Sequence, residues 1–87
     1  MDIPELVRVT PLSAYDLLLS YSDGSLRQFS CAPYLDRGVF SRLKDSTLFA
    51  QAHVAHGTVC WPGALDVAPE TLFLRSVPVT AREPVSD

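Results

Sequence analysis

Apolar and polar residues alternate on both sides of the sequence Ser22-Asp23-Gly24, which predicts a β-hairpin over residues 15–31. We expect a three-residue loop, with a type I turn and Gly24 in the left-handed region as a bulge. This loop pairs Leu17 with Phe29 and collects the apolar side chains on one face, whereas a two-residue loop would scatter them. The expected core face consists of Tyr15, Leu17, Leu19, Tyr21, Phe29 and Cys31.

The other face of this hairpin is expected to be mainly polar. It carries Asp16, Ser20, Gln28 and Ser30. Leu18 and Leu26 are the only large apolar residues on it. A sheet of this kind packs its apolar face on a core and leaves the polar face to solvent.

A further strand is expected over residues 6–10, just before Pro11. Val7 and Val9 alternate onto one face of it, and Arg8 and Thr10 occupy the other. Pro11 has no N–H for a sheet ladder, so this strand belongs at an edge. Because only a short connection separates it from the hairpin, we expect an antiparallel meander of three strands.

Helical spacing replaces alternation after the hairpin. Leu35, Val39 and Leu43 recur at intervals of four, which places them on one side of a helix. Gly38 weakens the first turn, so the helix is expected over residues 39–44.

A second, shorter hairpin is expected around His56-Gly57. A two-residue loop at this point pairs Val54 with Val59 on one side of the ribbon. On the other side it makes His53 and Cys60 direct cross-strand neighbours.

The rest of the chain predicts a brief final helix over residues 69–75, which begins with a proline. Residues 81–87 offer little to bury and are expected to be disordered. No repeat or linker divides the chain, so we expect one domain over residues 1–80. Its expected class is α+β, an antiparallel β-meander of three strands plus a second short hairpin, with short helices packed on one face.

Composition and charge narrow the functional classes. Apolar residues make up 47% of this 87-residue chain, which favours burial of some surface against a protein partner or in a homodimer. Seven scattered basic residues against ten acidic ones give a net charge of −3, so direct nucleic-acid binding is not expected. With no signal-peptide pattern and no apolar stretch of membrane length, we expect a cytoplasmic location and no membrane contact.

Two histidines and a cysteine invite a metal or catalytic interpretation. Imidazole and thiolate bind zinc, but three ligands are too few for a closed site, and strand alternation separates His56 from His53 and Cys60. We therefore expect no metal and no cofactor. The pair of His53 and Cys60 stands as an alternative ligand-binding or catalytic site, although a catalytic thiol would also need an oxyanion donor and a residue that orients its base.

Partner recognition has two candidate positions. Trp61 and Pro62 form the first, because tryptophan is enriched among interface hot spots, although a core position would explain the same tryptophan. Arg8 and Thr10 form the second, on the expected edge strand to which a partner strand could add.

Short motifs along the chain follow a characteristic order. They are Val9-Thr10-Pro11-Leu12, then residues 15–21 with Asp23-Gly24, then residues 35–43, Phe49, and Trp61-Pro62 leading through Asp66 to Pro69-Glu70-Thr71-Leu72. In this order they resemble the bacterial domain-of-unknown-function family 2442 (DUF2442), over roughly residues 7–74. In that family the second hairpin more often turns on acidic or glycine-rich residues than on His56-Gly57.

The resemblance implies a small α+β fold, and it carries over no catalytic residue because none is established in the family. Members are often encoded beside another small protein, and the pair has been suggested to act as toxin and antitoxin, which implies a binding role. We therefore expect a noncatalytic protein-interaction module, antitoxin-like, whose partner is the product of an adjacent gene. The alternative is a small enzyme or ligand-binding domain that uses His53 and Cys60, and a DNA-binding regulator ranks last.

Overall fold

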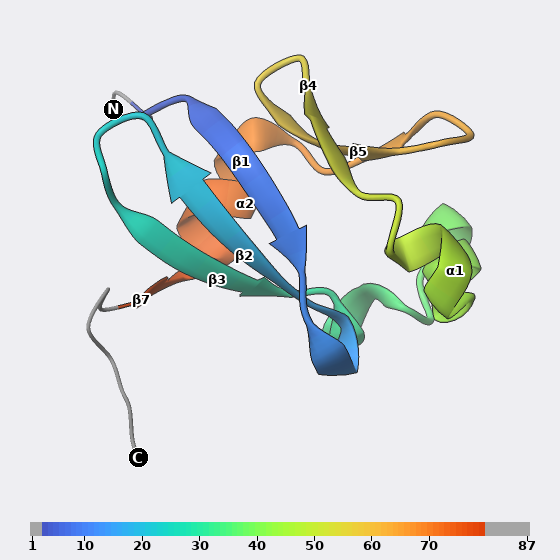
Figure 1. Cartoon of the computed structure of the whole chain (residues 1–87). Helices are drawn as coiled ribbons and strands as arrows, with labels where there is room; N and C mark the ends of the chain where they lie inside the picture. The colour runs from blue at the N-terminus through green and yellow to red at the C-terminus, as the bar shows by residue number, and fades with distance from the viewer. Residues whose placement is uncertain (1–2, 80–87) are drawn as a thin grey trace.

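Two antiparallel sheets and a few short helices make up the computed structural model of the chain, which describes residues 3–79 (Figure 1). The first sheet has the order β1-β2-β3-β7 and contains β1 (Leu6–Pro11), β2 (Asp16–Tyr21), β3 (Leu26–Ser30) and β7 (Val77–Val79). The second has the order β4-β5-β6 and contains β4 (His53–Ala55), β5 (Thr58–Trp61) and β6 (Leu65–Asp66). The helices are α1 (Ser46–Phe49), α2 (Pro69–Arg75) and the 3-10 segments η1 (Ser13–Tyr15), η2 (Ala32–Tyr34) and η3 (Gly38–Lys44).

The expected α+β class is confirmed, with its three-strand meander and its second hairpin. Each sheet also contains one strand that the sequence did not predict. In the first sheet β7 pairs with β3, and in the second β6 pairs with β5. The tail over residues 81–87, expected to be disordered, lies outside the described residues.

The first hairpin has the register expected of a three-residue loop. Leu17 lies opposite Phe29, and the Tyr21 amide donates to the Ser25 carbonyl at 3.0 Å. Gly24 closes the loop with a φ of 88°, in the left-handed region that only glycine adopts at little cost. The loop length has therefore placed the apolar residues of both strands on one buried face.

Replacing Gly24 by valine should destabilise the domain. A β-branched residue strongly disfavours a positive φ, and the left-handed conformation costs roughly 1 kcal/mol for a residue with a Cβ. An added Cβ would meet no atom within 4 Å, so the cost arises in the backbone alone. We expect a fall of several degrees in the thermal midpoint for Gly24→Val and a smaller fall for Gly24→Asn, which tolerates this conformation. An unchanged midpoint for the valine variant would contradict the turn.

The first strand differs from its expected alternation. A bulge shifts the β1–β2 register between Leu6 and Arg8. As a result Leu6 is buried and Val9 packs on the core, while Val7 is 56% exposed. The expectation that Val7 and Val9 share a face is wrong, because the extra residue of a bulge breaks the period of two.

The second hairpin also has its expected register, with His53 opposite Cys60 and Val54 opposite Val59. Both loop residues, His56 and Gly57, have positive φ angles of 54° and 78°, as a two-residue hairpin turn requires. Of the helices, α2 has the expected bounds. The helix expected over residues 39–44 is present as the 3-10 segment η3, which starts one residue earlier.

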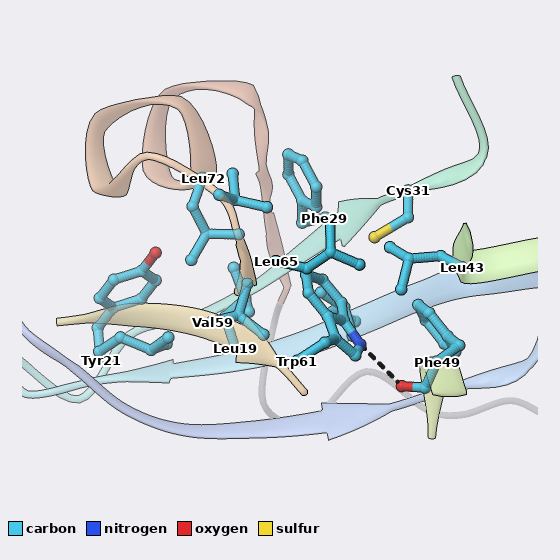
Figure 2. Close-up of a cluster of buried hydrophobic side chains, with 13 residues drawn as sticks. Leu19, Tyr21, Phe29, Cys31, Leu43, Phe49, Val59, Trp61, Leu65 and Leu72 are labelled. Carbon is cyan, nitrogen blue, oxygen red and sulfur yellow. Dashed lines mark hydrogen bonds between the residues drawn. The ribbon is translucent and has the colours of Figure 1, made fainter. Parts of the chain in front are cut away.

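The core lies between the meander on one side and α2 and the second sheet on the other. Figure 1 shows α2 on one side of the four-stranded sheet, and no helix or strand of residues 3–79 lies across the other side. Figure 2 shows Trp61 from β5 among side chains of β2, β3 and α2. No helix within residues 3–79 has the length and apolar character that crossing a membrane would require.

Candidate functional site

The outer face of the four-stranded sheet is covered by no other element of residues 3–79 (Figure 1), and we call it the open sheet face. Cross-strand pairing defines it, because residues that lie opposite one another project to the same side. One row across the sheet contains Arg8, Ser20, Leu26 and Val79, and the next contains Thr10, Leu18, Gln28 and Val77. The alternate residues of the same strands, Leu17, Leu19 and Phe29 among them, are buried in the core.

Four apolar side chains form an apolar patch over β2, β3 and the edge strand β7 on the open sheet face. Leu26 lies opposite Val79, and Leu18 and Val77 flank Gln28 in the next row. Val77 is 58% exposed, and the other three are only partly covered. Burying such a group against a second surface would release apolar area from water at about 25 cal/mol per Å².

Polar groups lie beside this apolar patch, toward β1 and between its members. Gln28 donates from Nε2 to Oδ2 of Asp16 at 2.8 Å, which holds both side chains on the same face. Arg8 and Thr10 are exposed along the β1 side of the sheet. Among residues 3–79 the guanidinium of Arg8 makes no ion pair, so it is available to a carboxylate on a partner.

The two edges of this sheet are poor templates for a partner strand. The bonds from Tyr21 N to Ser25 O and from Cys31 N to Tyr15 O show that odd-numbered residues of β2 and β3 bond each other. The even-numbered residues of β3 therefore face Val77 and Val79, and Pro78 turns its nitrogen, which carries no hydrogen, toward the free edge.

The other edge is interrupted as well. β1 carries the bulge near its start and Pro11 at its end. β4 also approaches β1 closely without pairing to it. Prolines, bulges and nearby elements are the usual means by which proteins prevent edge pairing. The face of the sheet is therefore more accessible to a partner than its edges, and it contains the two expected contact residues on β1, Arg8 and Thr10.

The structure places Trp61 in the core and not on a surface. Its side chain is 2% exposed, and Nε1 donates to the Phe49 carbonyl at 3.0 Å (Figure 2). The rings of Trp61 and Phe49 stack with centroids 6.2 Å apart. Pro62 is exposed beside it, so a partner at this point would touch the proline and not the indole.

His53 and Cys60 are cross-strand neighbours, but their reactive atoms have other partners. Nδ1 of His53 lies 3.1 Å from the Gln51 carbonyl, and the Cys60 thiol donates to the Ala55 carbonyl at 3.6 Å. Burial raises the pKa of the Cys60 thiol, and the carboxylate of Asp66 raises it further. A nucleophilic cysteine needs the opposite shift, so this arrangement does not activate the thiol.

Metal-ligating residues are also dispersed in the described part of the chain. Residues 3–79 hold no group of three or more histidine, cysteine, aspartate or glutamate side chains arranged to bind an ion. Cys31 and Cys60 are separate free thiols.

Sequence reasoning identified Arg8 and Thr10 but not the apolar patch on the same face. The signal was present in Leu18 and Leu26, two leucines on an otherwise polar hairpin face. Val77 and Val79 were missed because β7 itself was not predicted. Leucines that break the polar pattern of a sheet face are the feature that would have indicated this surface.

The features above define a small α+β domain in which one face of the main sheet is left uncovered by the other described elements. The chain matches the family described as "Protein of unknown function (DUF2442)" over residues 6–78. It belongs to this family, as its ordered motifs indicated. No curated protein and no solved structure matches the chain.

Proposed function

We propose that this protein is a noncatalytic interaction module that binds a partner protein through the open sheet face. The setting that fits is the bacterial cytoplasm, with the partner encoded by an adjacent gene and neutralised in an antitoxin-like manner. The choice of partner is supported by the suggestion that members of this family act with the product of a neighbouring gene as toxin and antitoxin. The mode of binding is supported by the open sheet face.

The observation that carries this proposal is the one-sided construction of the main sheet. Helix α2 and the second sheet both contribute to the core on one side of the main sheet. The other side retains four partly or fully exposed apolar residues, with polar side chains beside them on β1. Interfaces also combine apolar residues with neighbouring polar ones.

The chemistry of the face defines what the partner presents. Its apolar patch fits a row of aliphatic or aromatic side chains, as on one face of an amphipathic helix or sheet. Arg8 on β1 fits a carboxylate. Because both sheet edges are interrupted, the contact is made by side chains and not by a shared backbone ladder.

A matched pair of valine substitutions tests this proposal. Val77 on the open sheet face is 58% exposed, and Val39 on η3, outside the sheet, is 61% exposed. We expect Val77→Lys to weaken the complex with the neighbouring gene product at least about tenfold, because a buried ammonium without a partner is costly. Val39→Lys should leave the affinity unchanged.

Affinity is measured by calorimetry on the two purified proteins, after co-expression and gel filtration with light scattering. Equal affinity for both variants would place the contact elsewhere, and no complex at micromolar concentration would reject the adjacent gene product as partner. Light scattering on this protein alone gives a further outcome. A homodimer that Val77→Lys dissociates would show that a second copy, and not another protein, covers the open sheet face.

A further inference from the structure

A separate cavity opens on the core side of the main sheet, and we call it the aromatic pocket. It has a volume of about 240 Å³. The side chains that define its character are Phe29, Cys31, Tyr34, Phe40, Val67 and Ala68. They come from the end of β3, from η2 and η3, and from the segment between β6 and α2.

We propose that the aromatic pocket binds a small, neutral, apolar molecule with the size of a fused two-ring aromatic compound. The occupant is a free ligand and not a side chain of the partner. The pocket and the open sheet face lie on opposite sides of the sheet, because Phe29 and Cys31 belong to the buried face of β3 and its continuation. This proposal therefore does not depend on the proposed partner.

The volume sets the size of the ligand. An apolar cavity of about 150 Å³ is large enough to hold benzene, so this larger pocket accommodates a body with one additional small ring. The lining is almost entirely apolar and offers few hydrogen-bond partners. It therefore favours an apolar ligand, which gives up few hydrogen bonds to water when it enters the pocket.

Two ionisable groups that line the pocket, Cys31 and Asp66, favour a neutral ligand. Cys31 is 2% exposed, and burial raises the pKa of its thiol to about 12, so it is uncharged at neutral pH. Asp66 also borders the pocket. It lies opposite Cys60, however, while its neighbour Leu65 lies opposite the core residue Trp61, so the Asp66 side chain projects from the other face of β6.

Several contacts hold the lining in place without a ligand. Phe29 and Tyr34 stack with centroids 5.7 Å apart, and the Tyr34 amide donates to the Cys31 carbonyl at 2.9 Å. The guanidinium of Arg37 lies 5.8 Å from the centre of the Tyr34 ring. A pocket formed in advance saves the ordering cost of binding.

Contacts farther from the pocket fix η3, which carries Phe40. Lys44 at the end of η3 pairs with Asp36 at 2.8 Å. Arg42 in η3 donates from Nη1 to the Gly63 carbonyl at 3.2 Å, between β5 and β6. These contacts link η3 to the segment before it and to the loop between β5 and β6.

Indole is the probe for the first experiment, with indole-3-carboxylate as its charged counterpart. We expect indole to cause saturable amide shifts at Phe29, Cys31 and Val67 in two-dimensional NMR, with a Kd on the order of 0.1–1 mM. The carboxylate should bind at least about tenfold more weakly, because none of the side chains that line the pocket is a cation. Shifts confined to the open sheet face, no saturable shift at millimolar indole, or equal affinity for the carboxylate would overturn the proposal.

Leucine substitutions that fill the pocket provide the second experiment. Ala68→Leu adds volume at an exposed residue of the lining, and Ala50→Leu makes the same change at an exposed residue after α1, outside the pocket. We expect at least about tenfold weaker indole binding for Ala68→Leu and unchanged binding for Ala50→Leu. Thr71→Leu provides a second filling variant if Ala68→Leu folds poorly.

Indole affinity unchanged in a folded filling variant would overturn the assignment. Competition between indole and the neighbouring gene product at the same resonances would show that the pocket receives a protein side chain, which would also reject a free ligand. Loss of partner binding in Val77→Lys, by contrast, has no effect on indole titrations. The two proposals can therefore fail separately.

Discussion

Replacing Trp61 by alanine should lower the free energy of unfolding by about 3–5 kcal/mol, the largest effect that we expect from a single substitution. The indole is 2% exposed and stacks on Phe49. Its removal leaves a large cavity and also removes the hydrogen bond that Nε1 donates to the Phe49 carbonyl at 3.0 Å, which then keeps only the bond from the Ala52 amide at 3.2 Å. Small domains are marginally stable, so this loss would leave much of the protein unfolded at 37 °C.

Two further variants separate the causes of this loss. Trp61→Phe retains an aromatic ring but removes the N–H donor, so we expect an intermediate loss. Pro62→Ala changes an exposed neighbour and should shift the free energy by less than about 0.5 kcal/mol. Because Trp61 is the only tryptophan, unfolding in urea is followed by far-ultraviolet circular dichroism and not by fluorescence. A loss below about 1 kcal/mol for Trp61→Ala would return the indole to the candidates for partner contact.

The two hairpins could be predicted because turn chemistry and side-chain alternation point to the same register. In the first hairpin a three-residue loop that ends at Gly24 brings Leu17 opposite Phe29. In the second a two-residue loop, His56-Gly57, brings Val54 opposite Val59. In both cases a slip by one residue would place apolar side chains in solvent. The local pattern and the tertiary fold therefore agree.

The elements that were missed depend on distant parts of the chain. Val77-Pro78-Val79 is short and contains a proline, so nothing local distinguishes it from a loop. It forms a strand because β3 has a free edge and because Arg27 of β3 donates from Nη2 to the Ser76 carbonyl at 3.0 Å. The bulge in β1 is equally invisible in sequence, since Val7 and Val9 fit an unbroken alternation.

The candidate site was only partly predictable for the same reason. Alternation assigned Arg8 and Thr10 to one face of β1, but only the packing of α2 shows which face of the sheet stays uncovered. The aromatic pocket gave no signal at all in the sequence, because Phe29 and Phe40 read as ordinary core residues. Their cavity arises from the way in which short connecting segments meet at one end of the core.

Replacing Tyr21 by phenylalanine should stabilise the protein by about 1–2 kcal/mol at neutral pH. The Tyr21 hydroxyl is buried and has no hydrogen-bond partner among the residues that the structure describes. Its ring packs edge-on against Phe73 with centroids 5.3 Å apart, a contact that phenylalanine retains. The substitution therefore removes an unsatisfied polar atom without leaving a large cavity. Tyr34→Phe, at a partly exposed position, is the matched control and should change stability little.

The gain should increase at alkaline pH. Burial raises the pKa of the Tyr21 hydroxyl above its ordinary value of 10.0, an effect that the charge of Arg27 opposes only in part. The neutral phenol is thus favoured in the folded state, and the unfolded chain ionises first as pH rises above about 10. This contribution to stability is fully present below pH 10 and is lost as pH approaches the folded-state pKa, so wild-type protein loses stability that Tyr21→Phe retains.

Urea unfolding of both proteins between about pH 7 and pH 11 measures this difference, because the other ionisable groups are common to both and cancel. A gain that widens above pH 10 and is absent from Tyr34→Phe would establish the buried hydroxyl as its source. A destabilised Tyr21→Phe would contradict this account, since it would mean that the hydroxyl has a hydrogen-bond partner in solution. The phenol would then contribute to the stability of the fold through a contact at the end of β2, next to the first hairpin loop.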